Sequence, residues 1–174
     1  EVDAIDFIEG TWRIFGLRLD GKKAPKAADV DPEKWTKEHE RDYPGEPSQF
    51  FNTADAKISG QIRGYDSRLG FDNILLYYSN PFTGKRDPVA IPIMADGSFS
   101  VSVPMASPGY FSISGLGPEY VWLSYYAEPG RTLDILLDWD DVLQTSIDRI
   151  MERESRMANT RFGGDTGHIN RELA

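Results

Sequence analysis

The segment Asp96-Gly-Ser-Phe-Ser-Val-Ser-Val103 joins a turn dipeptide to six residues that alternate strictly between polar and apolar. Asp-Gly favours tight turns because both residues tolerate positive φ, and a period of two places successive side chains on opposite faces of a strand. We therefore expect a strand over 98–103, with Phe99 and Val101 facing the core and the serines facing solvent. A hairpin turn should precede it.

Similar runs lie on both sides of this segment, separated by turn dipeptides such as Pro108-Gly109 and Pro129-Gly130. The expected strands cover 11–19, 57–63, 73–78, 89–94, 98–103, 109–114, 120–126 and 132–137. Strands at this spacing, with no helical segments between them, indicate an antiparallel sandwich or barrel rather than a fold of βαβ units. We predict a mainly β protein, an antiparallel β-sandwich of about seven to eight strands.

Three strands carry a further expectation. The run 73–78 is apolar or aromatic after its first residue, which is typical of a central strand covered on both faces. Pro92 predicts that 89–94 is an edge strand or bulged, because proline has no N–H to donate. Gly16 interrupts the alternation in 11–19 and predicts a bulge there.

Helical signals lie outside the main strand series. Asp31-Pro-Glu33 combines an N-cap, a proline at the first helical position and an acidic first turn, so a short N-terminal helix should run to about Arg41. Trp35 would anchor that helix.

The C-terminal region changes to a helical period. Apolar residues recur every three or four positions and predict an amphipathic helix from about Asp140 to Met157. Gly163-Gly164 should end the helical region, and Asp165 or Thr166 can cap a second helix.

Three regions follow from this reading. Residues 1–50 form an N-terminal strand, a charged loop and a short helix, 51–138 form the sandwich, and 139–174 form a helical linker. The linker should lead toward a C-terminal domain that the sequence does not contain, since the chain reads as part of a longer polypeptide.

Composition excludes several classes of function. The 174 residues include no cysteine, which excludes disulfides, zinc thiolates, iron–sulfur sites and thiol nucleophiles. The net charge is −9, from 28 acidic and 19 basic residues, and it opposes binding to nucleic-acid phosphates or to an anionic membrane. No stretch approaches the roughly 18 apolar residues of a membrane span.

The sequence predicts no catalytic, cofactor-binding or metal-binding residue. The histidines, His39 and His168, lie outside the apolar strand ends where a scaffold presents a base, and Gly-x-Ser-x-Gly is absent. Asp134, Asp138, Asp140 and Asp141 could chelate calcium, but their spacing matches no EF-hand loop. A strand exit followed by a helix N-terminus is the favoured interpretation of these aspartates.

Aromatic residues are the chemically informative surplus. The candidate ligand-binding surface consists of Tyr77, Tyr78, Trp122, Tyr125 and Tyr126. Neighbouring strand residues face opposite sides, so each tyrosine pair should place one ring outward, where a row of rings could bind a sugar or a protein. The alternative is ordinary cross-strand stacking, because tyrosine is a good strand former.

The chain also resembles a known family. The segments that carry the likeness are Ala56-Lys-Ile-Ser-Gly-Gln-Ile-Arg-Gly-Tyr-Asp66, Asp96-Gly-Ser-Phe-Ser-Val-Ser-Val-Pro104, Tyr126-Ala-Glu-Pro-Gly-Arg-Thr-Leu133 and Arg161-Phe-Gly-Gly-Asp-Thr-Gly-His-Ile-Asn-Arg-Glu-Leu173. In this order, over about residues 50–174, they resemble the region that precedes the thioredoxin domain in exported TlpA-like thiol-disulfide oxidoreductases of Bacteroidetes bacteria.

The resemblance implies an accessory β-sandwich in a redox protein. The family's Trp-Cys-x-x-Cys motif cannot be carried over, because this chain has no cysteine. The resemblance also implies a periplasmic or outer-membrane-anchored lipoprotein.

Two main hypotheses follow. In the first, the chain is a non-catalytic accessory domain that positions its own C-terminal redox domain or recruits substrate proteins. In the second, it is a carbohydrate- or peptide-binding module that uses the surface tyrosines. Neither involves nucleic acid or membrane contact by this segment, and a small enzyme would need a histidine beside a carboxylate in a cleft.

Overall fold

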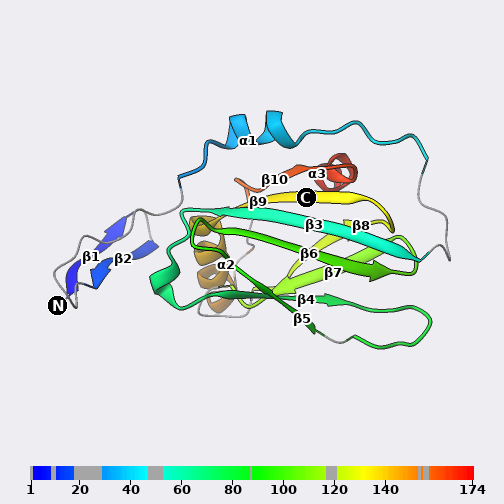
Figure 1. Cartoon of the computed structure of the whole chain (residues 1–174). Helices are drawn as coiled ribbons and strands as arrows, with labels where there is room; N and C mark the ends of the chain where they lie inside the picture. Colours follow the sequence, from blue (N-terminus) through cyan, green and yellow to red (C-terminus); the bar gives the residue numbers. More distant parts are fainter. Residues whose placement is uncertain are drawn as a thin grey trace.

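The computed structural model describes residues 2–8, 11–17, 29–46, 53–86, 88–116, 121–152, 154 and 157–174. Its main strands are β3 (Ala54–Arg63), β4 (Asn73–Tyr78), β5 (Pro88–Pro92), β6 (Ser98–Met105), β7 (Gly109–Ser114), β8 (Leu123–Ala127), β9 (Thr132–Asp138) and β10 (Arg161–Gly163). They form two four-stranded sheets in the orders β10-β9-β3-β6 and β5-β4-β7-β8 (Figure 1). The predicted mainly β, sandwich-like fold is confirmed.

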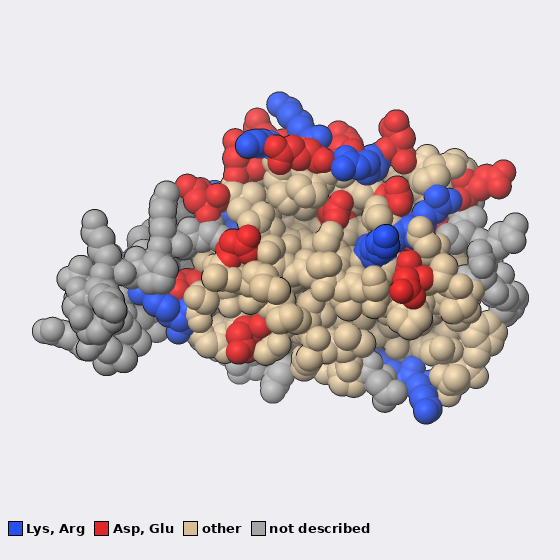
Figure 2. Space-filling model, in the orientation of Figure 1, with Lys and Arg blue, Asp and Glu red and all other residues tan. Residues whose placement is uncertain are grey.

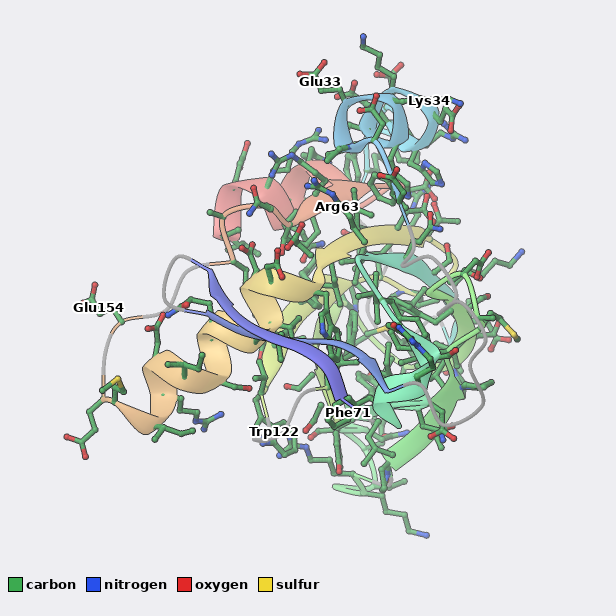
Figure 3. All side chains as sticks on the ribbon, turned by 90° about the vertical axis from the view of Figure 1, so that its left-hand side faces the viewer. Glu33, Lys34, Arg63, Phe71, Trp122 and Glu154 are labelled. Carbon is green, nitrogen blue, oxygen red and sulfur yellow. The ribbon has the colours of Figure 1, made fainter. Side chains whose placement is uncertain are left out.

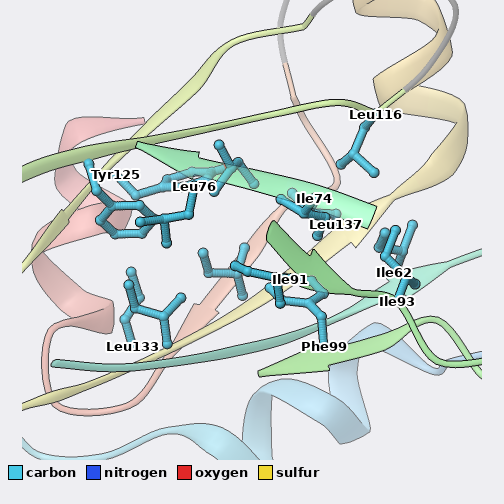
Figure 4. Packing of buried hydrophobic residues seen from close by; sticks show 14 of the residues in the cluster. Ile62, Ile74, Leu76, Ile91, Ile93, Phe99, Leu116, Tyr125, Leu133 and Leu137 are labelled. Atoms are coloured by element: carbon cyan, nitrogen blue, oxygen red, sulfur yellow. The ribbon is translucent and has the colours of Figure 1, made fainter. Parts of the chain in front are cut away.

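The two sheets share one hydrophobic core. Alternate residues of each strand supply it, as Figure 4 shows for Ile74 and Leu76 of β4 and for Leu133 and Leu137 of β9. In β6 the buried side chains include Phe99 and the exposed ones are serines and a proline, as the alternation predicts.

One strand pair departs from the antiparallel expectation. β3 is antiparallel to β6 but parallel to β9, with Ile58 opposite Leu133 and Ile62 opposite Leu137. Parallel neighbours need a crossover connection. Here the connection between β3 and β9 consists of β6 and the four strands of the other sheet, so no βαβ unit is required.

The Asp96-Gly97 turn forms, but the predicted hairpin is wrong. The turn links β5 of one sheet to β6 of the other, and the Met94 N–H donates to the Ser98 carbonyl oxygen at 2.8 Å. Gly97 has φ 81°, and a Cβ there would lie 2.6 Å from the Ile62 carbonyl oxygen. Glycine is therefore required by both conformation and space.

Of the other strand expectations, the one for β5 holds and the one for β4 holds in part. β5 is an edge strand, as Pro92 predicts. β4 is an inner strand of its sheet, but Leu75 and Tyr77 on its outer face are only half-buried, so the prediction of cover on both faces is wrong.

A separate antiparallel pair joins β1 (Val2–Ile8) to β2 (Thr11–Leu17). The pairing keeps one register from Val2 opposite Leu17 to Ile8 opposite Thr11, so no residue is inserted at Gly16 and the predicted bulge is wrong. Residues 18 and 19 of the expected strand lie outside the described residues.

The short N-terminal helix α1 (Pro32–His39) is confirmed. The Asp31 carboxylate accepts hydrogen bonds from the Glu33 and Lys34 N–H groups, and Trp35 is buried. Figure 2 shows charged side chains gathered over α1, while most of the described remainder of that view is uncharged.

The second helix, α2 (Trp139–Ile150), ends seven residues before the predicted Met157. Met157 nevertheless packs against the core, and the Thr145 hydroxyl donates to its sulfur at 3.3 Å. The spacing of apolar residues therefore predicted correctly that Met157 packs against the core. It did not predict that the helix ends at Ile150.

The last helix, α3 (Gly167–Leu173), follows Thr166 as predicted, although Thr166 makes no side-chain capping bond. β10 precedes it and pairs with β9, a strand that the sequence analysis did not predict. In the part of the chain that the structure describes, no helix is long and apolar enough to span a bilayer.

Candidate functional site

The alternation of β4, β7 and β8 divides the aromatic residues between two faces of the sheet β5-β4-β7-β8. The face turned away from the core, here called the outer face, carries Tyr77, Tyr110, Ser112, Trp122, Ser124 and Tyr126. In Figure 3, Trp122 lies on the opposite side of the sandwich from Glu33 and Lys34 of α1.

Two of the predicted surface residues belong to the core. Tyr125 is buried, its ring lies edge-on to Phe162 at 5.5 Å, and burial raises its pKa. Tyr78 packs against the core, and its hydroxyl oxygen accepts a hydrogen bond from the Ala106 N–H at 3.3 Å. The candidate surface therefore keeps Tyr77, Trp122 and Tyr126 and loses these two.

An aromatic–cation cluster occupies one end of the outer face. The rings of Tyr77 and Trp122 lie 4.7 Å apart at 40°, and the Arg86 guanidinium carbon lies 5.4 Å and 5.3 Å from their centroids. Tyr77 comes from β4 and Trp122 from the segment before β8, so they meet across β7, where small Ser112 lies opposite Tyr77. Trp122 stays 41% exposed.

A second aromatic pair occupies the other end. Tyr110 and Tyr126 are opposite each other in the β7–β8 ladder, with ring centroids 5.9 Å apart at 72°. Tyr110 is 60% exposed. Between the two aromatic ends, the hydroxyl oxygens of Ser112 and Ser124 lie 3.1 Å apart.

A buried carboxylate fixes Tyr126 in place. Glu128 is 1% exposed, and its Oε1 accepts hydrogen bonds from the hydroxyls of Tyr126 at 3.0 Å and Tyr43 at 3.1 Å. Burial, and then the Glu128 charge, raise the pKa of Tyr126; burial and the bond to Glu128 raise the pKa of Tyr43. Both hydroxyls therefore keep their protons and donate at neutral pH.

An open hollow adjoins the Tyr110 end of the outer face, between β8 and α3. Its volume is about 280 Å³. It is lined by Tyr110, Ser124, Tyr125, Phe162, Asn170, Leu173 and Ala174. This volume lies just under the roughly 300–1,000 Å³ of small-molecule sites, so it suits one or two side chains of a longer ligand.

The histidines are placed by aromatic packing. His39 stacks on Trp35 with ring centroids 4.2 Å apart, and its Nδ1 lies 2.8 Å from the Trp35 carbonyl oxygen. His168 packs against Tyr43 at 4.8 Å. Within the described residues, neither imidazole is hydrogen-bonded to a hydroxyl or carboxylate side chain.

The aspartates near α2 have structural partners. Asp138 is the N-cap of α2 and accepts from the Asp140 and Asp141 N–H groups, as the helix-start interpretation predicts. Asp138 also pairs with Arg63 at 3.3 Å, and the Ser59 hydroxyl donates to Asp134. Among the described residues, no group of three or more His, Asp or Glu side chains is arranged to hold a metal ion.

The surface predicted from the sequence did not include Tyr110. Its signal was present, since Tyr110 and Ser112 share one face of a strand whose other face carries Phe111 and Ile113. Comparisons with protein-family models, with curated proteins and with solved structures found no match.

Proposed function

We propose that this chain is a non-catalytic carbohydrate-binding module, and that its ligand lies across the outer face of the sheet β5-β4-β7-β8. One observation carries the proposal: exposed aromatic rings stand at both ends of this face, with a pair of serine hydroxyls between them. Tyrosine and tryptophan offer large, rigid contact areas, and serine offers adaptable hydrogen bonds.

The arrangement favours a sugar over a peptide on this face. β4 and β7 each have a strand on both sides, so their main-chain groups are engaged in the sheet. A ligand lying there meets side chains only. Flat rings suit the apolar faces of pyranose units and hydroxyls suit their polar rims, whereas an extended peptide would leave its own N–H and C=O groups without partners.

Arg86 gives this surface its rigidity. Its guanidinium lies over both Tyr77 and Trp122, and such cation–π contacts contribute about 0.5–1 kcal/mol each at exposed sites. Rings that are already held in place lose less freedom when a ligand binds, which strengthens binding.

Titration with hexasaccharides of glucose, mannose, xylose and N-acetylglucosamine, followed by tryptophan fluorescence and calorimetry, tests the proposal. Trp122→Ala and Tyr110→Ala should each weaken binding about tenfold or more, the size of an interface hot spot. Ile150→Ala is the matched control, because Ile150 is an exposed apolar residue on α2 and not on the outer face. Failure of every hexasaccharide to bind, or equal affinity of Trp122→Ala and the unchanged chain, would contradict the proposal.

The accessory role in a thiol-disulfide oxidoreductase stays a prediction supported by the sequence resemblance over residues 50–174. So does the periplasmic or outer-membrane location that the resemblance implies. A sugar-binding sandwich is compatible with such a role. Reading the gene downstream of Ala174 tests it: a Cys-x-x-Cys motif there supports the role, and a stop codon contradicts it.

A further inference from the structure

β8 lies at the end of its sheet, and part of its free edge is already occupied by a side-chain amide. β7 pairs with one edge of β8. On the other edge, the Asn170 side chain accepts from the Tyr126 N–H at 2.8 Å and donates to the Tyr126 carbonyl oxygen at 2.9 Å. The Asn170 amide therefore bonds to Tyr126 as the N–H and C=O of one residue in a neighbouring antiparallel strand would.

The next edge position along β8 is open. In an antiparallel ladder, the N–H and C=O of alternate residues point to the same edge. Since those of Tyr126 point toward Asn170, those of Ser124 point the same way. Ser124 is exposed, and its main chain has no partner on that side among the residues that the structure describes.

The hollow between β8 and α3 lies beside this open position. Ser124 and Asn170 both line it, together with the apolar surfaces of Phe162 and Leu173. Leu173 is 54% exposed. Open main-chain groups next to an apolar hollow combine the two features that strand-addition sites use: hydrogen bonds for affinity and a pocket for one side chain.

We infer that the β8 edge binds an extended peptide segment of another protein. The peptide adds a strand to the sheet at Ser124, next to the position that the Asn170 amide occupies. The main chain of the peptide bonds to Ser124, and one apolar side chain enters the hollow. An extended peptide is the occupant because a β main chain presents N–H and C=O groups in the alternation that this edge offers, and because the Asn170 amide already fills the neighbouring position with the same donor and acceptor groups. The site adjoins the sugar surface and shares the side chains of Tyr110 and Ser124 with it, but its hydrogen bonds come from the main chain of β8 rather than from side chains of the outer face.

Backbone N-methylation of a probe peptide tests the inference without altering the protein. The probes are Ac-Thr-Val-Thr-Leu-Thr-Val-Lys-amide and two versions of it, N-methylated on the odd-numbered or on the even-numbered residues. One methylated version should lose at least about tenfold in affinity and the other should bind like the parent, because only alternate N–H groups face β8. Binding is measured by calorimetry and by amide shifts of the labelled protein.

Two pairs of protein variants extend the test. Ser124→Pro removes the edge N–H and should abolish binding, whereas Ser124→Ala retains that N–H and should bind. Leu173→Asp should weaken binding, whereas Ile150→Asp, on exposed surface of α2, should not. Circular dichroism checks that each variant is folded.

Four outcomes would overturn the inference. The first is no binding of the parent peptide at about 1 mM, and the second is equal binding of both methylated versions. The third is that Trp122→Ala loses peptide binding while Ser124→Pro keeps it. The fourth is that the chain binds no peptide but forms a dimer, and that Ser124→Pro disrupts this dimer. The third would place the peptide on the outer face, and the fourth would assign the edge to a second copy of this chain. Neither the expected result nor these failures depend on whether hexasaccharides bind.

Discussion

Gly60 of β3 lies between β6 and β9, opposite Phe99 of β6 and Ile135 of the unexpected parallel partner β9. A Cβ at this position would approach within 3.0 Å of both the Ile135 carbonyl oxygen of β9 and the Phe99 ring of β6, closer than real Cβ contacts. The end of the ring can move, but the carbonyl belongs to the parallel β3–β9 ladder. Gly60→Ala must therefore open that ladder or distort its own strand.

The expected cost follows from overpacking. Extra methyl groups in a packed core cost about 1–3 kcal/mol, and the immobile carbonyl puts Gly60→Ala near about 3 kcal/mol. For a chain of this length, that corresponds to a melting temperature lower by roughly 6–12 °C. Gly109→Ala is the control: it is also a strand glycine without positive φ, nothing lies within 4 Å of its Cβ, and it should be neutral or stabilising by up to about 1 kcal/mol.

Urea denaturation followed by circular dichroism gives both free energies of unfolding. If Gly60→Ala and Gly109→Ala differ by less than about 0.5 kcal/mol, the change is no larger than an ordinary surface substitution and the placement of β3 against β9 is refuted. Adding Phe99→Leu to Gly60→Ala should recover part of the loss but not all of it, because the Ile135 carbonyl remains.

Three further predictions concern the contacts around the outer face and α2. Asp138→Ala removes the N-cap of α2 and should lower the free energy of unfolding in urea by about 1–2 kcal/mol, with Asp138→Asn much closer to the unchanged chain. Asn170→Ala removes the side-chain partner of the Tyr126 main chain and should cost about 1–3 kcal/mol by the same measurement, whereas a cost below about 0.5 kcal/mol would contradict this. Burial and the Glu128 charge raise the pKa of Tyr126, so the folded state keeps a proton that the unfolded state releases. Stability should be unaffected by this group below about pH 10 and fall as the pH rises further, and a Tyr126→Phe variant with an equally steep fall would contradict this.

Local pattern predicted most of the strands because burial on one face leaves a period of two in the sequence. In β6, Phe99 and Val103 are buried and Ser100 and Ser102 exposed, as expected. Turn residues located the strand ends, and β4 and β7 have the expected bounds.

The same pattern could not predict which strands pair with each other in the sheets. Asp96-Gly97 specifies a tight turn, but whether the strands it joins lie in one sheet depends on contacts distant in sequence. The parallel β3–β9 pair depends on such contacts too. β10 has three residues, too few for any period to appear, and its single inward ring is Phe162.

The candidate surface was partly predictable. Around β8, Ser124 marks the polar side of the alternation, so Trp122 and Tyr126 could be assigned to the outer face and Tyr125 to the core. Around β4, Asn73 marks the polar side in the same way, so the alternation would have assigned Tyr77 to the outer face and Tyr78 to the core. The register with Ser112 and Phe111 of β7 agrees with that assignment.

The central claim, that the outer face binds sugar, is tested most directly by the indole N–H signals of the labelled protein during titration with the hexasaccharide of highest affinity. The signal of Trp122 should shift with saturation, because its ring forms part of the surface. Those of Trp35 and Trp139, which are buried away from this face, should stay in place. A saturating shift of either buried tryptophan, with Trp122 unmoved, would contradict the account.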